Sequence, residues 1–210
     1  MKAVVFLMLS ALAVESALCD SQVLVRRHPG DRLDVSLGNE VTHAALTAQA
    51  WLVRQQNDDG SWGVDAATNQ FETMTALFAL KAFGQPESTN AIARGEAFLR
   101  TLKLDQGFPA FPFGASILQS RAEFEKKWPL AERLSMREIW GLSCSINRAG
   151  GVLCDSTGAM QAWRPEIARR ILSSQRAGGV RGDAYWPAPK GVKWGDVSET
   201  AFALLAFFEL

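Results

Sequence analysis

Two glutamates in this chain stand where side chains could do acid–base or binding chemistry. Glu72 and Glu199 are each followed by threonine, and each shares its segment with a tryptophan, Trp62 and Trp194 respectively. A carboxylate beside an aromatic plate is suited to sugars, through hydrogen bonding and ring stacking. An acid in the first turn of a helix is also favourable without any ligand. The four residues are therefore candidate ligand-binding residues, with helix stabilisation as the alternative for the two glutamates and core packing for the tryptophans; no catalytic residue is assigned.

The sequence offers little other material for catalysis or metal binding. It contains no HExxH pattern, Gly-rich phosphate loop or serine nucleophile elbow. The adjacent acids Asp58 and Asp59 fall in a run of turn-forming residues, which favours a structural role over an acid site. His28 and His43 are the only histidines, so no metal or cofactor is predicted.

Two cysteines flank the turn at Gly150 and Gly151. Cys144 and Cys154 could form a disulfide that closes this loop if the protein reaches an oxidising compartment. Two unpaired thiols are the alternative.

The first residues have the composition of a targeting segment. Lys2 precedes an apolar run of signal-peptide length, which is shorter than a membrane span requires. Small residues at Ala17 and Cys19 predict a signal peptide over residues 1–19, cleaved after Cys19. We therefore expect a secreted or periplasmic protein in which residues 20–210 form a single domain without a membrane span.

Charge and aromatic content narrow the classes of partner. The chain has 22 basic and 22 acidic residues, so its net charge gives no reason to expect nucleic acid. It has seven tryptophans and twelve phenylalanines against one tyrosine, a bias toward aromatic side chains that pack. Such rings fill cores more often than they line ligand sites.

The candidate residues must be positioned by helices. Apolar and small residues at helical spacing predict one helix over residues 41–56 and a second over about 70–83. Thr68 or Asn69 is expected to cap the second helix, and Gly84 sits where a helix-terminating glycine belongs. The unit is thus a helix, a turn carrying Gly-Ser-Trp, and a second helix.

This unit recurs along the chain. Trp51, Leu52, Gln56, Gly60 and Trp62 mark the first copy. A shift of 47 residues finds Phe98, Leu99, Lys103 and Gly107, and Phe108 follows directly after Gly107. A weaker third copy keeps Gln175 and Gly179, with its tryptophans displaced to Trp186 and Trp194. A period in the forties is typical of stacked supersecondary units that share one core. The structural positions of the repeat are Trp51, Gln56, Gly60, Phe98, Gly107, Gln175 and Gly179.

The pattern resembles the Gln-Trp repeat of the squalene and terpene cyclase family. That resemblance covers about residues 41–113 and 165–210, and it implies an all-α, α/α toroid in which inner and outer helices alternate, a fold also found in prenyltransferase subunits. The chain is long enough for about four hairpins, so we expect an incomplete, toroid-like arc. It lacks the Asp-x-Asp-Asp acid motif of the cyclases and the zinc ligands of the prenyltransferases. Whether it is an enzyme stays open.

Two functions remain from these observations. The first is a non-catalytic domain that binds a ligand or a protein on a concave aromatic face. The alternative is an enzyme, either a small terpene-cyclase-like protein or one that acts on polysaccharides. The possible partners are accordingly an apolar ligand, a glycan or another protein.

Overall fold

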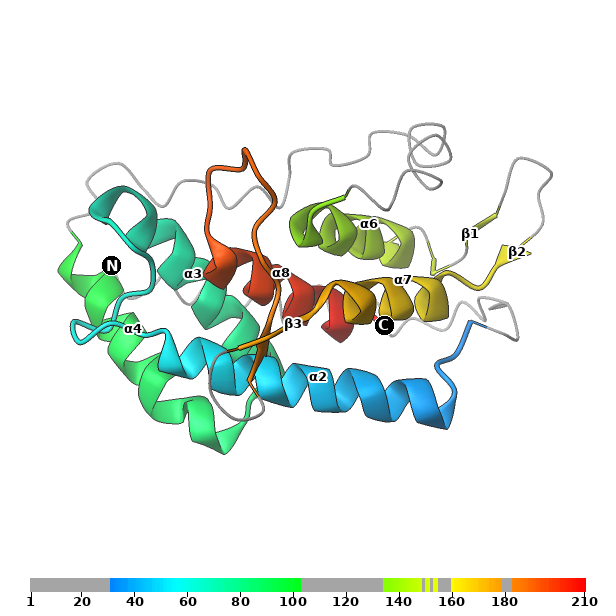
Figure 1. Cartoon of the computed structure of the whole chain (residues 1–210), viewed down its shortest axis with the longest axis horizontal. Coiled ribbons are helices and arrows are strands. Elements are labelled where there is room, and N and C mark those ends of the chain that lie inside the picture. Colours follow the sequence, from blue (N-terminus) through cyan, green and yellow to red (C-terminus); the bar gives the residue numbers. More distant parts are fainter. Residues whose placement is uncertain (1–30, 103–133, 149, 152, 155–159, 179–182) are drawn as a thin grey trace.

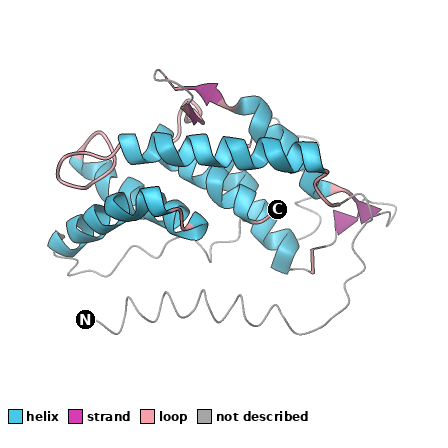
Figure 2. Cartoon of the chain, turned by 90° about the horizontal axis from the view of Figure 1, so that it is seen from below, coloured by secondary structure: helices cyan, strands magenta, loops and turns pink. Residues whose placement is uncertain are grey.

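Helices make up most of the structure, a computed structural model that describes residues 31–102, 134–148, 150–151, 153–154, 160–178 and 183–210. The helices are α2 (Val35–Arg54), α3 (Ala66–Phe83), α4 (Thr89–Thr101), α6 (Met136–Arg148), α7 (Trp163–Ser174) and α8 (Asp196–Phe208), with a 3-10 turn at η1 (Pro86–Ser88). Two antiparallel pairs accompany them at the margins of the helical cluster, β1 (Leu153–Cys154) with β2 (Met160–Gln161) and β3 (Arg176–Ala177) with β4 (Ala184–Tyr185) (Figure 2). The predicted all-α class is confirmed.

Short polar side chains set where the first two helices begin. Asp34 caps α2, because its Oδ1 accepts from the backbone N–H of Leu37 at 2.8 Å, and the helix therefore starts before the predicted residue 41. Asp65, not Thr68 or Asn69, has the capping role in α3, since its Oδ1 accepts from the Thr68 N–H at 2.9 Å. The α3 helix ends at Gly84 as predicted, with a φ of 59° that suits glycine.

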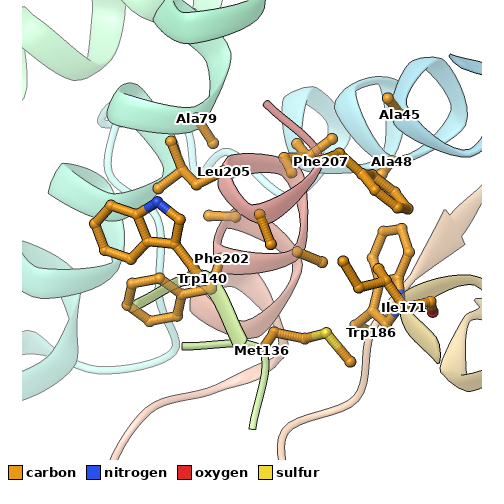
Figure 3. Packing of buried hydrophobic residues seen from close by; sticks show 14 of the residues in the cluster. Ala45, Ala48, Ala79, Met136, Trp140, Ile171, Trp186, Phe202, Leu205 and Phe207 are labelled. Carbon is orange, nitrogen blue, oxygen red and sulfur yellow. Dashed lines mark hydrogen bonds between the residues drawn. The ribbon is translucent and has the colours of Figure 1, made fainter. Parts of the chain in front are cut away.

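Helix α8 forms the centre of the core. Every residue from Val197 to Phe207 is buried, and α8 packs against α2, α3 and α6 (Figure 1). In the close view, Trp140 and Phe202 lie on one side of α8, while Trp186, Ile171 and Phe207 lie on the side toward α2 (Figure 3). A helix that is apolar all round needs such an enclosed position.

The first and last copies of the repeat share one set of hydrogen bonds. The backbone N–H groups of Trp62 and Trp186 donate to Thr73 and Thr200, at 2.8 and 3.0 Å. The two indole N–H groups donate to carbonyl groups near the ends of the preceding helices, those of Leu52 and Ile171, both at 2.7 Å. Both tryptophans are essentially fully buried. Trp186 therefore takes the place of Trp62 in the last copy.

The turn of the first copy is docked onto the second. The Gln56 side chain donates from Nε2 to the carbonyls of Gly60 (3.0 Å) and Ala91 (2.8 Å). Gly60 has a φ of 87°, and a Cβ there would lie 2.5 Å from the carbonyl oxygen of Arg94 in α4. The corresponding Nε2 of Gln175 is buried with no partner among the described residues, which do not include Gly179.

Trp62 also contacts the second copy at a position where only hydrogen fits. An ideal Cβ on Gly95 of α4 would lie 2.6 Å from Cζ3 of Trp62 and 3.0 Å from Cδ2 of Leu77. We expect Gly95→Ala to lower the free energy of unfolding by about 1–3 kcal/mol, the range for overpacking a core, in urea denaturation. Gly38→Ala is the matched control: it lies in α2 with nothing within 4 Å of the added Cβ, and it should stabilise by roughly 0.5–1 kcal/mol. Equal effects of the two substitutions would contradict this close packing.

The outermost copies pack directly on one another. Helix α3 lies beside α8, and α2 lies beside α7 (Figure 1). The toroid-like arc of about four hairpins stays a prediction, because its middle, residues 103–133 with Gly107, falls outside the described residues, as does the predicted signal peptide. Among the residues described, no helix is both long and apolar enough to cross a bilayer.

Candidate functional site

The structure brings three of the four candidate binding residues together. Glu72 of α3, Glu199 of α8 and Trp194, which precedes α8, gather at the N-terminus of α8 through hydrogen bonds, and Glu199 also contacts the first residue of α6. Trp62 takes no part in these hydrogen bonds. It is 0% exposed and packs against Gly95 of the second copy, so its ring is not available to a ligand at the surface.

Glu199 is bonded through both carboxylate oxygens. Its Oε2 accepts from the indole Nε1 of Trp194 at 2.8 Å, and its Oε1 accepts from the backbone N–H of Met136, the first residue of α6. The first backbone N–H groups of a helix have no partner within it, so this carboxylate supplies one from a neighbouring helix. Glu199 is 1% exposed.

Glu72 makes the equivalent contact one helix away. Its Oε1 accepts from the backbone N–H of Gly195, the N-cap residue of α8, at 2.7 Å. A Cβ at position 195 would lie 2.8 Å from this same oxygen, so any larger residue there would push the Glu72 carboxylate away from the Gly195 N–H. In both cases, therefore, the repeated glutamate of one helix holds the N-terminus of the next, from α3 to α8 and from α8 to α6.

Burial shifts the acidity of both glutamates in the same direction. Loss of water raises the pKa of Glu72, and the charges of Asp196 and Asp65 add to this rise against the lowering effect of the Gly195 N–H. Loss of water also raises the pKa of Glu199, with Glu138 and Asp196 acting in the same sense against the bonds from Met136 and Trp194. Both carboxyls thus keep a proton to higher pH than an exposed glutamate. Within the described residues, no group of three His, Cys, Asp or Glu side chains is arranged to hold a metal ion.

Aromatic rings and one arginine surround the glutamates. Trp194 lies 6.4 Å from Phe71 and 6.2 Å from Phe202 between ring centroids, and the Arg137 guanidinium sits 5.2 Å above the Trp194 ring. Phe202 also stacks on Trp140, at 5.7 Å. Phe71, Arg137 and Trp194 are half-buried and are called the Trp194 patch below. Arg137 could not be found from the local sequence pattern, because it is distant from Trp194 along the chain.

The acid pair in the first turn has a local structural role. Asp59 Oδ1 accepts from the Ser61 N–H at 2.9 Å and from the Ser61 hydroxyl at 2.7 Å. These two bonds lower the pKa of Asp59, which is the opposite of what a proton donor needs. Two other repeat positions are described: Trp51 stacks on Tyr185 at 5.0 Å between centroids, and Phe98 is half-buried in α4, whereas Gly107 and Gly179 lie outside the described residues.

Cys144 is one of the two cysteines for which the sequence left both a disulfide and free thiols open. It is a free thiol whose Sγ donates to Glu209 Oε1 at 3.4 Å, while the side chain of Cys154 lies outside those described. Burial raises the pKa of the Cys144 thiol, and the Glu209 carboxylate raises it further. A thiol held in this way is a poor nucleophile.

A thiol-labelling experiment distinguishes the two states of Cys144. In the mature chain, purified without reductant, we expect Cys144 to resist iodoacetamide while folded and to react fully once unfolded in urea. Peptide mass spectrometry should locate the label on Cys144 in the unfolded sample alone. A peptide pair joined through Cys144 and Cys154 would contradict the free thiol.

Comparison with known proteins identifies no relative of this chain. No family model, no curated protein and no solved structure matches the chain.

Proposed function

We propose that this chain is an exported, non-catalytic domain of the terpene-cyclase-like repeat class, and that it binds a partner protein through the Trp194 patch. The observation that carries the proposal is the way Glu72 and Glu199 are used. Both are buried, and their hydrogen bonds go to neighbouring helix N-termini and to the Trp194 indole. Carboxylates that hold helices together are not free to bind a sugar hydroxyl or protonate an alkene.

The chemistry of the Trp194 patch supports a protein partner. Tryptophan and arginine are enriched among residues that dominate the energy of protein interfaces. Arg137 is held over the Trp194 ring, and Phe71 lies against it, so the side chains are positioned before a partner arrives. Restricting side chains in advance lowers the entropic cost of association.

An enzyme is the alternative, and one observation favours it. Glu199 is a carboxyl with a raised pKa among aromatic rings, a setting in which a general acid keeps its proton to higher pH than an exposed glutamate does. Against it stands the 1% exposure of Glu199, which leaves the substrate no path to its proton. The binding role therefore has the better support.

Site-specific crosslinking tests the proposal in the cells that export the protein. A photoreactive phenylalanine is placed at the exposed Lys193, beside Trp194. We expect a discrete protein adduct that Arg137→Glu reduces at least tenfold, because it removes the cation over the ring. Arg169→Glu, the same charge change at an exposed position on α7, should leave the adduct unchanged.

The competing outcomes are distinguished with purified protein. Calorimetric titration with farnesol or cellohexaose should show no saturable binding, and farnesyl diphosphate should not be consumed. Saturable binding of either compound that depends on Arg137, turnover of the diphosphate, or an adduct insensitive to Arg137→Glu would overturn the proposal.

A further inference from the structure

The segment between β4 and α8 is attached to the core through carboxyl groups. Three hydrogen bonds end on acids: the N–H of Ala188 donates to Asp196 Oδ1 (2.8 Å), the indole of Trp194 donates to Glu199, and the N–H of Gly195 donates to Glu72. We call residues 187–195 the clasp loop. The acids that hold it come from α3 and α8, so the loop bridges the first and last copies of the repeat.

Like charges gather around these attachment points. Asp196 raises the energy of the ionised form of both Glu72 and Glu199. Asp65, which caps α3, has the same effect on Glu72, and Glu138 on α6 has it on Glu199. Arg137 on α6 lies over the Trp194 ring, and the clasp loop carries Lys190 and Lys193, which are exposed. Exposed lysines are hydrated and screened by salt. They therefore only weakly offset the repulsion between the buried glutamates and the neighbouring acids.

We propose that the clasp loop is a pH-sensitive catch, closed over Glu72 and Glu199 while these carboxyls are protonated and released toward solvent as they ionise. A neutral carboxyl still offers an acceptor oxygen to an N–H donor, so protonation keeps the contacts. Ionisation places charges beside Asp196 in a site from which water is excluded. Release of the loop lets both charges reach water and separates Trp194 from Glu199. This inference concerns the loop alone and does not depend on the proposed partner.

The direction of the pH effect follows from proton binding. In the closed form both glutamates have a raised pKa, whereas in the released form they regain the ordinary value. The closed form therefore binds more protons, and it is favoured fully below the ordinary value near 4.5. As the pH rises from there toward the raised values, the ratio of released to closed forms grows by as much as about tenfold per pH unit for each carboxyl that titrates.

Hydrogen exchange at a single amide measures this equilibrium. Gly195 N–H is protected only while it is bonded to Glu72. In the mature protein, the protection of this amide, corrected for the intrinsic pH dependence of exchange, should fall as the pH is raised from 4.5 to 7.5. Glu72→Gln keeps an acceptor oxygen for Gly195 and removes one titrating group. The slope of protection against pH should therefore become shallower, by up to about tenfold per pH unit. Glu87→Gln, at an exposed position, should leave the profile as in the wild type.

A direct titration of the two carboxyls in the wild type tests the proposal even if Glu72→Gln does not fold. Carboxyl carbon shifts of Glu72 and Glu199, followed by NMR over the same pH range, should change together with the protection of Gly195. Corrected protection that is constant with pH, or a profile that Glu72→Gln leaves unchanged, would overturn the proposal. If Glu72→Gln fails to fold, coincidence of the wild-type titration with loss of protection supports the catch, and titration without loss of protection refutes it.

Discussion

Replacing Trp62 with alanine is expected to lower the free energy of unfolding by about 3–5 kcal/mol, the range for removing a large aromatic side chain from a core. The ring is 0% exposed, lies against Gly95 of the next copy, and gives its indole N–H to the Leu52 carbonyl. Alanine would leave a cavity and a buried carbonyl without its donor. Thermal unfolding should register the loss, at roughly 2–4 °C for each kcal/mol in a domain of this size.

Trp186→Ala is the matched test of the repeat. Its indole donates to the Ile171 carbonyl over the same 2.7 Å and its ring is equally buried, so the loss should be of similar size. Phe208→Ala is the control, because this ring is 60% exposed and substitutions at the surface change stability by about 0.5 kcal/mol or less. A melting temperature unaffected by Trp62→Ala would show that the indole does not bind the copies together.

Removing Arg164 should destabilise the protein by about 3–5 kcal/mol, because it leaves a buried carboxylate unpaired. Arg164 and Asp31 are 4% and 2% exposed and form an ion pair, and the Arg164 backbone N–H also donates to Asp31 at 2.9 Å. The guanidinium further donates to Asn147 Oδ1 at 2.7 Å and lies 4.4 Å above the Trp163 ring. Arg164→Met keeps much of the packing and removes the charge, and urea denaturation gives the loss.

The double substitution isolates the cost of the orphaned charge. Asp31→Leu combined with Arg164→Met removes both charges, and a buried pair replaced by apolar groups of similar size is often neutral. We expect the double variant to be more stable than Arg164→Met alone. If it is less stable, the loss in the single variant comes from packing and not from the unpaired Asp31.

Local patterns in the sequence predicted the helices and the first copy of the repeat. Gln56, Gly60 and Trp62 lie within one turn, so their spacing reports directly on the bonds they make. The last copy was harder to align because its tryptophan follows Gln175 by eleven residues, whereas Trp62 follows Gln56 by six. Strands β3 and β4 lie in this longer segment, and because of its length the sequence alone did not distinguish Trp186 from Trp194.

The contacts between distant segments had no such local signal. Glu72 and Gly195 are 123 residues apart, and Asp31 and Arg164 are 133 apart. The repeat predicted that Glu72 and Glu199 occupy equivalent positions, but which donors they meet depends on how α3, α6 and α8 pack. The capping of α3 by Asp65 was missed for a different reason: several neighbouring residues are good caps, and backbone geometry decides among them.

The position of α8 has a consequence for biosynthesis. This helix follows every other described element in chain order, yet α2, α3 and α6 each pack on it. Until α8 has been synthesised, the apolar faces of α2, α3 and α6 that pack against it remain uncovered. The contacts that bury α8 can therefore form only after this segment has been synthesised, and the apolar surface exposed until then favours aggregation.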